Sequence, residues 1–178
     1  CLSPEQQCEK RKEYMKWEED SCVAREFQDF CANVDASDDI KHTIGLMKAE
    51  ASATDCLATE NWWKTQDALE LWDRNGDTNI KNIAPIMSFK NLKKIVLKNN
   101  KIEDVFPLGQ LTDLEFLELG SNNIVDVGPL ANLKNLKYLE LGENDIVNLT
   151  PLAELKSLET LSLWNNNITT VEIGRAHV

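Results

Sequence analysis

A pattern that recurs every 22 residues in the second half of the chain constrains the fold more than any other feature of the sequence. Its copies begin at Leu92, Leu114, Leu136 and Leu158. They read LKKIVLKNNKIEDVFPLGQLTD, LEFLELGSNNIVDVGPLANLKN, LKYLELGENDIVNLTPLAELKS and LETLSLWNNNITTV. One such unit is too small to bury its own apolar side chains. The units must therefore stack into a solenoid, each covering its neighbour.

Each recurring position has a physical role. The alternating part of the LxxLxL spacing predicts a short strand that turns its apolar side chains inward. The proline-leucine pair, as in Pro107-Leu108, predicts a short helical return, because the amide that proline lacks would be unpaired in the first turn of a helix. A buried asparagine amide after each strand can satisfy backbone groups where the chain turns away. We expect these amides to form a ladder: Asn100, Asn122, Asn144 and Asn166.

This pattern resembles the 22-residue leucine-rich repeats of bacterial internalins, and also those of eukaryotic phosphatase-regulating proteins. The resemblance covers roughly residues 80–171. It implies an α/β fold, a curved leucine-rich-repeat solenoid with parallel strands on the concave face and short helical returns on the convex face. It also implies a helical cap before the repeats and binding of a protein or other macromolecule on the concave face. The cysteines of the cap depart from the family pattern, so the resemblance does not imply the ligand.

The chain divides into three segments. Residues 1–75 are expected to form an all-α, cysteine-bearing cap, with helices over 37–51 and 59–71 and a helical hairpin near Asp20. The aromatic cluster of Trp62, Trp63 and Trp72 is expected to cover the open end of the first repeat. Repeats follow over 76–171, as four to five coils of a longer array. Residues 172–178, EIGRAHV, resemble a translated sequencing adapter, and we interpret them as an assembly artefact.

Five cysteines lie before the repeats, and their spacing points to disulfides rather than to a metal. No CxxC occurs, and the only nearby histidine is His42, so a zinc site is poorly supported. Disulfides indicate an oxidising compartment, whereas the alternative is buried thiols in the cytosol. Four cysteines allow three pairings, of which we favour Cys8–Cys31 with Cys22–Cys56. The fifth, Cys1, is either the lipid-carrying residue of a mature bacterial lipoprotein or an arbitrary point of truncation.

Alternating polar residues at Asp73, Asn75, Asp77 and Asn79 invite comparison with a calcium-binding loop. Thr78 stands where that loop requires glycine, so we interpret the segment as a polar turn.

Charge and composition argue against several classes of function. The net charge of -11 disfavours nucleic acid and anionic membranes, both of which attract basic proteins. No apolar stretch approaches the roughly 20 residues of a membrane span, so membrane contact would come only through a lipid at Cys1. His42 is the only histidine outside the adapter-like segment, which makes a catalytic triad hard to assemble. We expect no catalytic residues, no metal and no cofactor.

The residues between the core leucines are expected to line the concave face in columns. Exposed aromatics on a strand face cost solubility, so Phe116, Tyr138 and Trp164 are the preferred anchors for a partner. The neighbouring acidic residues favour a partner that presents lysine or arginine. High strand propensity is the alternative explanation of the aromatics. The candidate binding residues are Lys94, Phe116, Glu118, Tyr138, Glu140 and Trp164.

Two functional hypotheses follow. The first is a non-catalytic binding module of an exported bacterial protein or lipoprotein, at the cell surface, in the periplasm or secreted. The second is a cytoplasmic regulatory subunit of an enzyme, in which the cysteines are reduced. The two hypotheses differ in the redox state of the cysteines.

Overall fold

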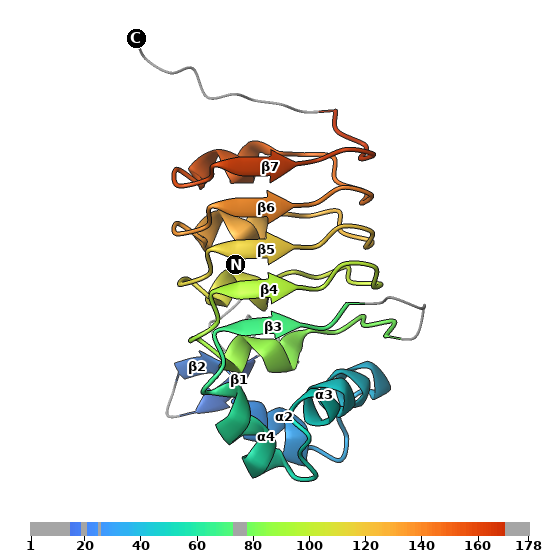
Figure 1. Cartoon of the computed structure of the whole chain (residues 1–178), viewed down its shortest axis with the longest axis vertical. Helices are drawn as coiled ribbons and strands as arrows, with labels where there is room; N and C mark the ends of the chain where they lie inside the picture. The colour runs from blue at the N-terminus through green and yellow to red at the C-terminus, as the bar shows by residue number, and fades with distance from the viewer. Residues whose placement is uncertain (1–14, 19–20, 25, 73–77, 170–178) are drawn as a thin grey trace.

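The computed structural model of the chain describes residues 15–18, 21–24, 26–72 and 78–169. Its main feature is a five-stranded parallel sheet in which each strand belongs to one coil of a solenoid (Figure 1). The strands follow one another in sequence order: β3 (Ala68–Glu70), β4 (Lys94–Val96), β5 (Phe116–Glu118), β6 (Tyr138–Glu140) and β7 (Thr160–Ser162). The expected stacking of one coil on the next is confirmed.

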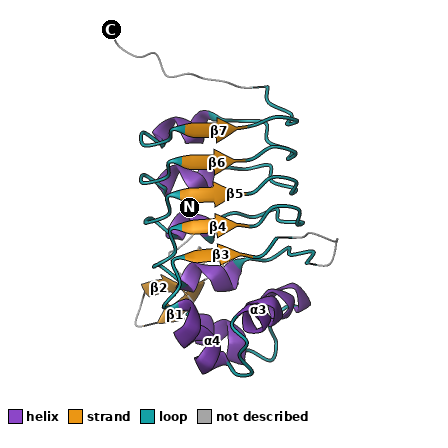
Figure 2. Ribbon diagram, in the orientation of Figure 1, coloured by secondary structure: helices purple, strands orange, loops and turns teal. Residues whose placement is uncertain are grey.

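A short 3-10 helix returns the chain from each strand to the next. The returns lie together behind the sheet (Figure 2), so the opposite face of the sheet is the concave face. Their bounds are η1 (Ala84–Ser88), η2 (Leu108–Gln110), η3 (Gly128–Asn132) and η4 (Thr150–Glu154). Proline stands at the start of η1, η3 and η4 and immediately before η2, as the repeat pattern predicts.

The core lies between the sheet and the returns. Leu117 from a strand and Leu130 from a return are both fully buried, and their equivalents in the other inner coils are buried as well. Burying a leucine stabilises a protein by roughly 1.5–3 kcal/mol, so the leucine stack is the main source of stability. In the last described coil Leu161 is 42% exposed, because no further coil covers it among the described residues.

The asparagine ladder runs through every described coil from β4 onward. Asn122 Oδ1 accepts a hydrogen bond from the backbone N of Ile102 at 3.0 Å. Its Nδ2 donates to the carbonyl of Leu119 in its own coil, at 2.9 Å, and to that of Leu97 in the preceding coil, at 3.0 Å. The same pattern of bonds recurs at Asn100, Asn144 and Asn166. Each amide thus joins two adjacent coils, as the repeat pattern predicts.

The N-terminal cap is not all-α, which corrects the expectation from sequence. Its described part begins with an antiparallel hairpin of β1 (Met15–Glu18) and β2 (Ser21–Ala24), where a helical hairpin was expected. Three helices follow: α2 (Phe27–Ala32), α3 (Asp38–Glu50) and α4 (Cys56–Trp63). The helix expected over 37–51 is confirmed as α3. The helix expected over 59–71 is wrong, because α4 ends at Trp63 and the following segment forms β3.

The first coil of the solenoid begins earlier than the expected boundary between residues 75 and 76. Leu69 of β3 pairs with Ile95, 26 residues later, whereas Ile95 pairs with Leu117 at the regular spacing of 22. Four additional residues between β3 and Ile80 therefore break the period and conceal this strand in the sequence. Three of the alternating polar residues, Asp73, Asn75 and Asp77, fall in this interval of the sequence and lie outside the described residues.

A disulfide joins Cys31, at the end of α2, to Cys56, at the start of α4. The favoured pairings Cys8–Cys31 and Cys22–Cys56 are therefore wrong. The expectation placed Cys8 and Cys31 on two arms of one helical hairpin, whereas the described residues at its expected turn pair as the strands β1 and β2. Cys1 and Cys8 lie outside the described residues, and Cys22 lies in β2.

Aromatic side chains attach the cap to the first return. Trp63 is buried and lies 6.2 Å from Phe89, measured between ring centroids, and its Nε1 donates to the Met47 carbonyl at 3.1 Å. Phe27 of α2 contacts the same Phe89, at 5.2 Å. Trp62 packs edge-on against Trp63, so these two tryptophans cover the end of the solenoid as expected. Trp72 does not, because it lies beside Lys98 of the next coil.

Replacing Asn122 with alanine is expected to lower the free energy of unfolding by about 2–4 kcal/mol, because the buried amide of Ile102 loses its acceptor. Denaturant unfolding measures this effect. The matched control is Asn123→Ala, at the adjacent exposed asparagine, which should change stability by less than about 0.5 kcal/mol. Equal effects at the two positions would contradict the ladder.

Replacing both Cys31 and Cys56 with serine is expected to lower the free energy of unfolding by about 3 kcal/mol. The disulfide closes a loop with a sequence separation of 25 residues, and removing it returns that freedom to the unfolded chain. Guanidinium unfolding of the variant and of the oxidised and reduced parent measures the difference. A linkage map that pairs Cys31 with Cys8 would contradict the structure.

Candidate functional site on the concave face

The concave face is built from side chains that alternate with the buried core of each strand. In β5, Leu117 points into the core, whereas Phe116 and Glu118 are partly exposed on the opposite face. The strand register places equivalent residues of successive coils side by side. The first column runs Lys94, Phe116, Tyr138 and Thr160, and the second runs Val96, Glu118, Glu140 and Ser162. The expected columns are therefore present.

Two of the predicted aromatic anchors form a stacked pair. The rings of Phe116 and Tyr138 lie 4.3 Å apart between centroids and are inclined by only 4°. Lys94 Nζ lies 5.4 Å from the centroid of Phe116, on the side of the first coil. The third anchor, Trp164, is 58% exposed. The face therefore presents aromatic surface from β5 to the end of β7.

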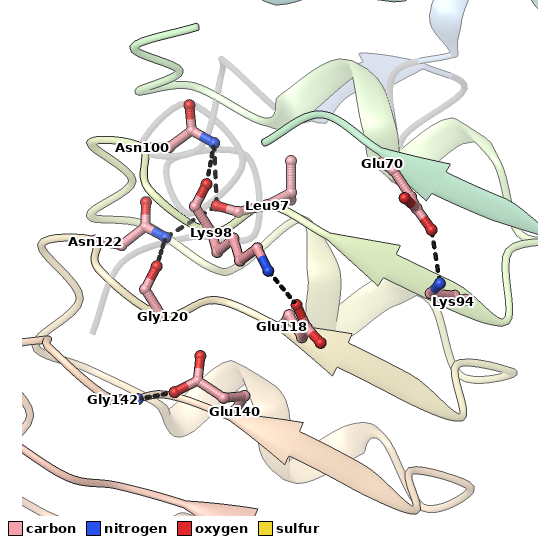
Figure 3. Close-up of polar contacts among 10 residues, drawn as sticks. All are labelled: Glu70, Lys94, Leu97, Lys98, Asn100, Glu118, Gly120, Asn122, Glu140 and Gly142. Atoms are coloured by element: carbon pink, nitrogen blue, oxygen red, sulfur yellow. Dashed lines mark hydrogen bonds and ion pairs between the residues drawn. The ribbon is translucent and has the colours of Figure 1, made fainter. Parts of the chain in front are cut away.

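The carboxylates of the second column have different partners. Glu70 of β3 forms an ion pair with Lys94 at 2.6 Å, and Glu118 forms one with Lys98 at 3.4 Å (Figure 3). Glu140 Oε1 instead accepts a hydrogen bond from the backbone N of Gly142 at 2.8 Å. This bond fixes the carboxylate of Glu140 against the strand end without neutralising it.

Two glycines create space for these side chains. Gly120 and Gly142 occupy the position that Lys98 has in the preceding coil. A Cβ on Gly120 would lie 2.9 Å from Cδ of Glu140, and a Cβ on Gly142 would lie 2.6 Å from Cε2 of Trp164. The carboxylate and the indole therefore rest against bare backbone. The predictions from sequence assigned no role to these glycines, although the change from lysine to glycine at one repeat position is visible in the sequence.

A shallow groove of about 330 Å³ follows from this arrangement. It contains four of the six predicted binding residues, Glu118, Tyr138, Glu140 and Trp164, whereas Lys94 and Phe116 lie outside its lining. The complete lining is Lys98, Asn99, Glu118, Gly120, Ser121, Tyr138, Glu140 and Trp164.

A second hollow of about 410 Å³ lies beside the strand starts, lined by Lys93, Asp113, Glu115, Asn135, Lys137 and Ser157. Its central charges neutralise each other, because Lys137 pairs with Glu115 at 2.6 Å. The hydrogen bond in this pair raises the pKa of Lys137 and lowers the pKa of Glu115. This hollow therefore offers less uncompensated charge than the groove.

The electrostatic environment of the groove acts on Tyr138. Partial burial raises the pKa of its phenol, and the negative charges of Glu118 and Glu140 raise it further. The aromatic stack thus carries a hydroxyl group that stays protonated beside two carboxylates.

The remaining chemistry of the described residues is sparse. They hold no group of three or more histidine, cysteine, aspartate or glutamate side chains that could bind a metal ion. His42 lies in α3 and contacts the backbone carbonyl of Thr78. No helix within the described ranges is long and apolar enough to cross a membrane.

The geometry defines the class of protein: a leucine-rich-repeat solenoid with a partly exposed aromatic and acidic concave face. The family profile described as leucine-rich repeats in two copies matches residues 90–132 and 112–154, and the single leucine-rich repeat matches residues 157–174. No curated protein matches the chain by sequence.

Solved internalin structures are similar to the chain. An internalin (inlF) of Listeria monocytogenes is 25% identical, with a TM-score of 0.66 over 84% of this chain. Internalin C2 of the same organism is 25% identical, with a TM-score of 0.52 over 81%. A leucine-rich-repeat protein of Leptospira interrogans is 25% identical, with a TM-score of 0.51 over 63%. The chain spans 42%, 70% and 34% of these three proteins. The chain therefore carries leucine-rich repeats and is similar in structure to Listeria internalins.

The phenol of Tyr138 is expected to titrate above 10.0 in the folded protein, and Glu118→Gln with Glu140→Gln should lower its pKa. The pKa of Tyr138 should remain partly raised in this double variant, because burial is the largest cause of its shift. Since the folded state holds the proton more tightly, Tyr138 adds stability that is present below its ordinary pKa and lost as pH rises through the folded value. Ultraviolet titration measures the shift, with Tyr138→Phe to assign it. Glu70→Gln is the control and should leave it unchanged.

Proposed function

We propose that this chain is a protein-binding module that engages its partner with the concave face. The carrying observation is the Phe116–Tyr138 stack, which continues through the groove to an indole that is 58% exposed. Rigid aromatic side chains lose little entropy on binding and supply most of the affinity at many protein interfaces. Leucine-rich-repeat solenoids present such side chains on a fixed curved surface, which reduces the cost of association.

The partner in this proposal carries a basic segment. Glu118 and Glu140 line the groove, and the chain as a whole has a net charge of -11. A negative surface accelerates association with a positively charged protein and disfavours nucleic acids and anionic membranes. Binding is the whole activity proposed for this chain, without catalysis and without a cofactor.

The proposed location is outside the cytoplasm of a bacterium, at the cell surface, in the periplasm or secreted. The Cys31–Cys56 disulfide supports this location, since disulfides persist mainly in oxidising compartments. The similarity to Listeria internalins supports a bacterial origin. A lipid at Cys1 remains part of the proposal and would anchor the protein to a membrane. The alternative, a cytoplasmic regulatory subunit, requires the cysteines that form this disulfide to be reduced.

The double variant Phe116→Ser/Tyr138→Ser is expected to weaken partner binding at least about thirtyfold, because it removes the central aromatic anchors. Proteins retained on the immobilised chain are identified first, and the affinity of each is then measured by calorimetry. The matched control is Val125→Ser/Val147→Ser, which removes exposed apolar side chains outside the strands. A partner that is lost with the control variant and kept with the concave-face variant would overturn the proposal.

A further inference from the structure

At two places on the concave face, a lysine ammonium lies close to both a carboxylate and an aromatic ring. Lys94 Nζ lies 2.6 Å from the carboxylate of Glu70 and 5.4 Å from the ring centroid of Phe116. Lys98 Nζ lies 3.4 Å from the carboxylate of Glu118 and 4.6 Å from the ring centroid of Trp72. Both rings lie within the roughly 6 Å over which the face of an aromatic ring attracts a cation.

Glu140 repeats the carboxylate of this arrangement one coil further on, with aromatic rings beside it. Tyr138 and Trp164 line the groove together with Glu140. A Cβ on Gly142 would lie 2.7 Å from Oε1 of Glu140 and 2.6 Å from the indole carbon Cε2 of Trp164, so the carboxylate and the indole border the same point. A carboxylate and aromatic rings therefore lie close together here, as they do around Lys94 and Lys98, although they come from different coils relative to one another.

No lysine of the described ranges forms an ion pair with the carboxylate of this third set. Lys98 reaches Glu118 of the following coil, and the equivalent residue that would reach Glu140 is Gly120. Among the described residues Glu140 forms no ion pair, and its carboxylate accepts a hydrogen bond from the backbone N of Gly142 (Figure 3). Glu118 is balanced by Lys98, so Glu140 carries the uncompensated charge of the groove.

We propose that Glu140, Tyr138 and Trp164 form a receptor for one cationic side chain, a lysine or an arginine, of the partner protein. The inference rests on the proposed function and names the group that the groove recognises. The carboxylate of Glu140 accepts hydrogen bonds from the bound cation, and the rings contact its face and its apolar stem. An arginine makes both kinds of contact at once, since its planar guanidinium stacks on an indole while it donates hydrogen bonds to a carboxylate.

The receptor is organised before the cation binds. The hydrogen bond from Gly142 N holds the carboxylate in place, and the bare backbone of Gly120 and Gly142 leaves room beside it. The Phe116–Tyr138 stack holds the ring of Tyr138 from the other side. Groups that are already oriented lose little freedom on binding, so a single side chain can be recognised with useful affinity.

The test uses small probes, so it does not require the partner. Nα-acetyl-arginine N-methylamide is titrated into the full chain while the indole N–H resonance of Trp164 is followed by NMR, with Trp164→Phe to assign the signal. The expected result is a saturable shift with the arginine probe and with the corresponding lysine probe. The citrulline analogue, which has nearly the same shape without the charge, should produce no saturable shift.

Glu140→Gln should weaken binding of the arginine probe about three- to tenfold, the range expected for an exposed ion pair supported by a cation–π contact. The matched control is Glu70→Gln, which removes the same charge from the same face at a carboxylate paired with Lys94. It should leave the affinity within about twofold. Equal responses to arginine and citrulline, or no difference between the Glu140 and Glu70 variants, would overturn the inference.

A second variant supplies the cation within the chain. Gly120→Lys adds an ammonium at the position from which Lys98 reaches Glu118 in the preceding coil, and the carboxylate end of the Glu140 side chain must shift to admit the new Cβ. It should abolish the response to the arginine probe, whereas Gly120→Gln, which displaces the same carboxylate without adding a charge, should retain a saturable response. An unchanged response to the arginine probe in Gly120→Lys would overturn the inference. A partner that depends on Phe116 and Tyr138 but not on Glu140 would leave the proposed function standing and remove only this inference.

Discussion

The side-chain amides that join neighbouring coils are the interaction on which the rest of this structure depends. Asn122 accepts from one backbone amide and donates to carbonyls of two coils, so it fixes the distance and the register between them. Register decides which side chains become neighbours on the concave face. The stacking of Phe116 on Tyr138 follows from it, because the two rings lie in one column on adjacent strands. The buried ladder therefore positions the exposed surface.

On this fixed scaffold, a single repeat position changes the chemistry of the surface. Lysine at position 98 neutralises a carboxylate of the next coil, whereas glycine at positions 120 and 142 leaves the carboxylate and the indole against bare backbone. The change costs little in the fold, since neither glycine has the positive φ that would demand glycine. A repeat protein can thus acquire a binding site by substitution in one column, without alteration of its core.

The cap protects the end of the solenoid that carries the first coil. Without it, the apolar residues of η1 would face solvent, because no earlier coil covers them in the part of the chain that the structure describes. Trp63 and Phe27 cover Phe89 from two different helices, and the Cys31–Cys56 disulfide links those helices. A small helical unit has a limited core of its own, so a covalent link is an effective way to stabilise it. The irregular first coil is the point at which this cap and the regular array meet.

The sequence by itself determined the coil: its 22-residue period, its buried leucines, its asparagine ladder and the columns of its concave face. These features depend on residues at short fixed spacings, and every coil repeats the same local geometry. Only the tertiary structure decided the disulfide partner of Cys31, the strand at Ala68–Glu70, and which lysine pairs with Glu70 and which with Glu118. These features depend on contacts between elements that are not separated by a regular spacing in the sequence. The spacing of residues therefore does not predict them.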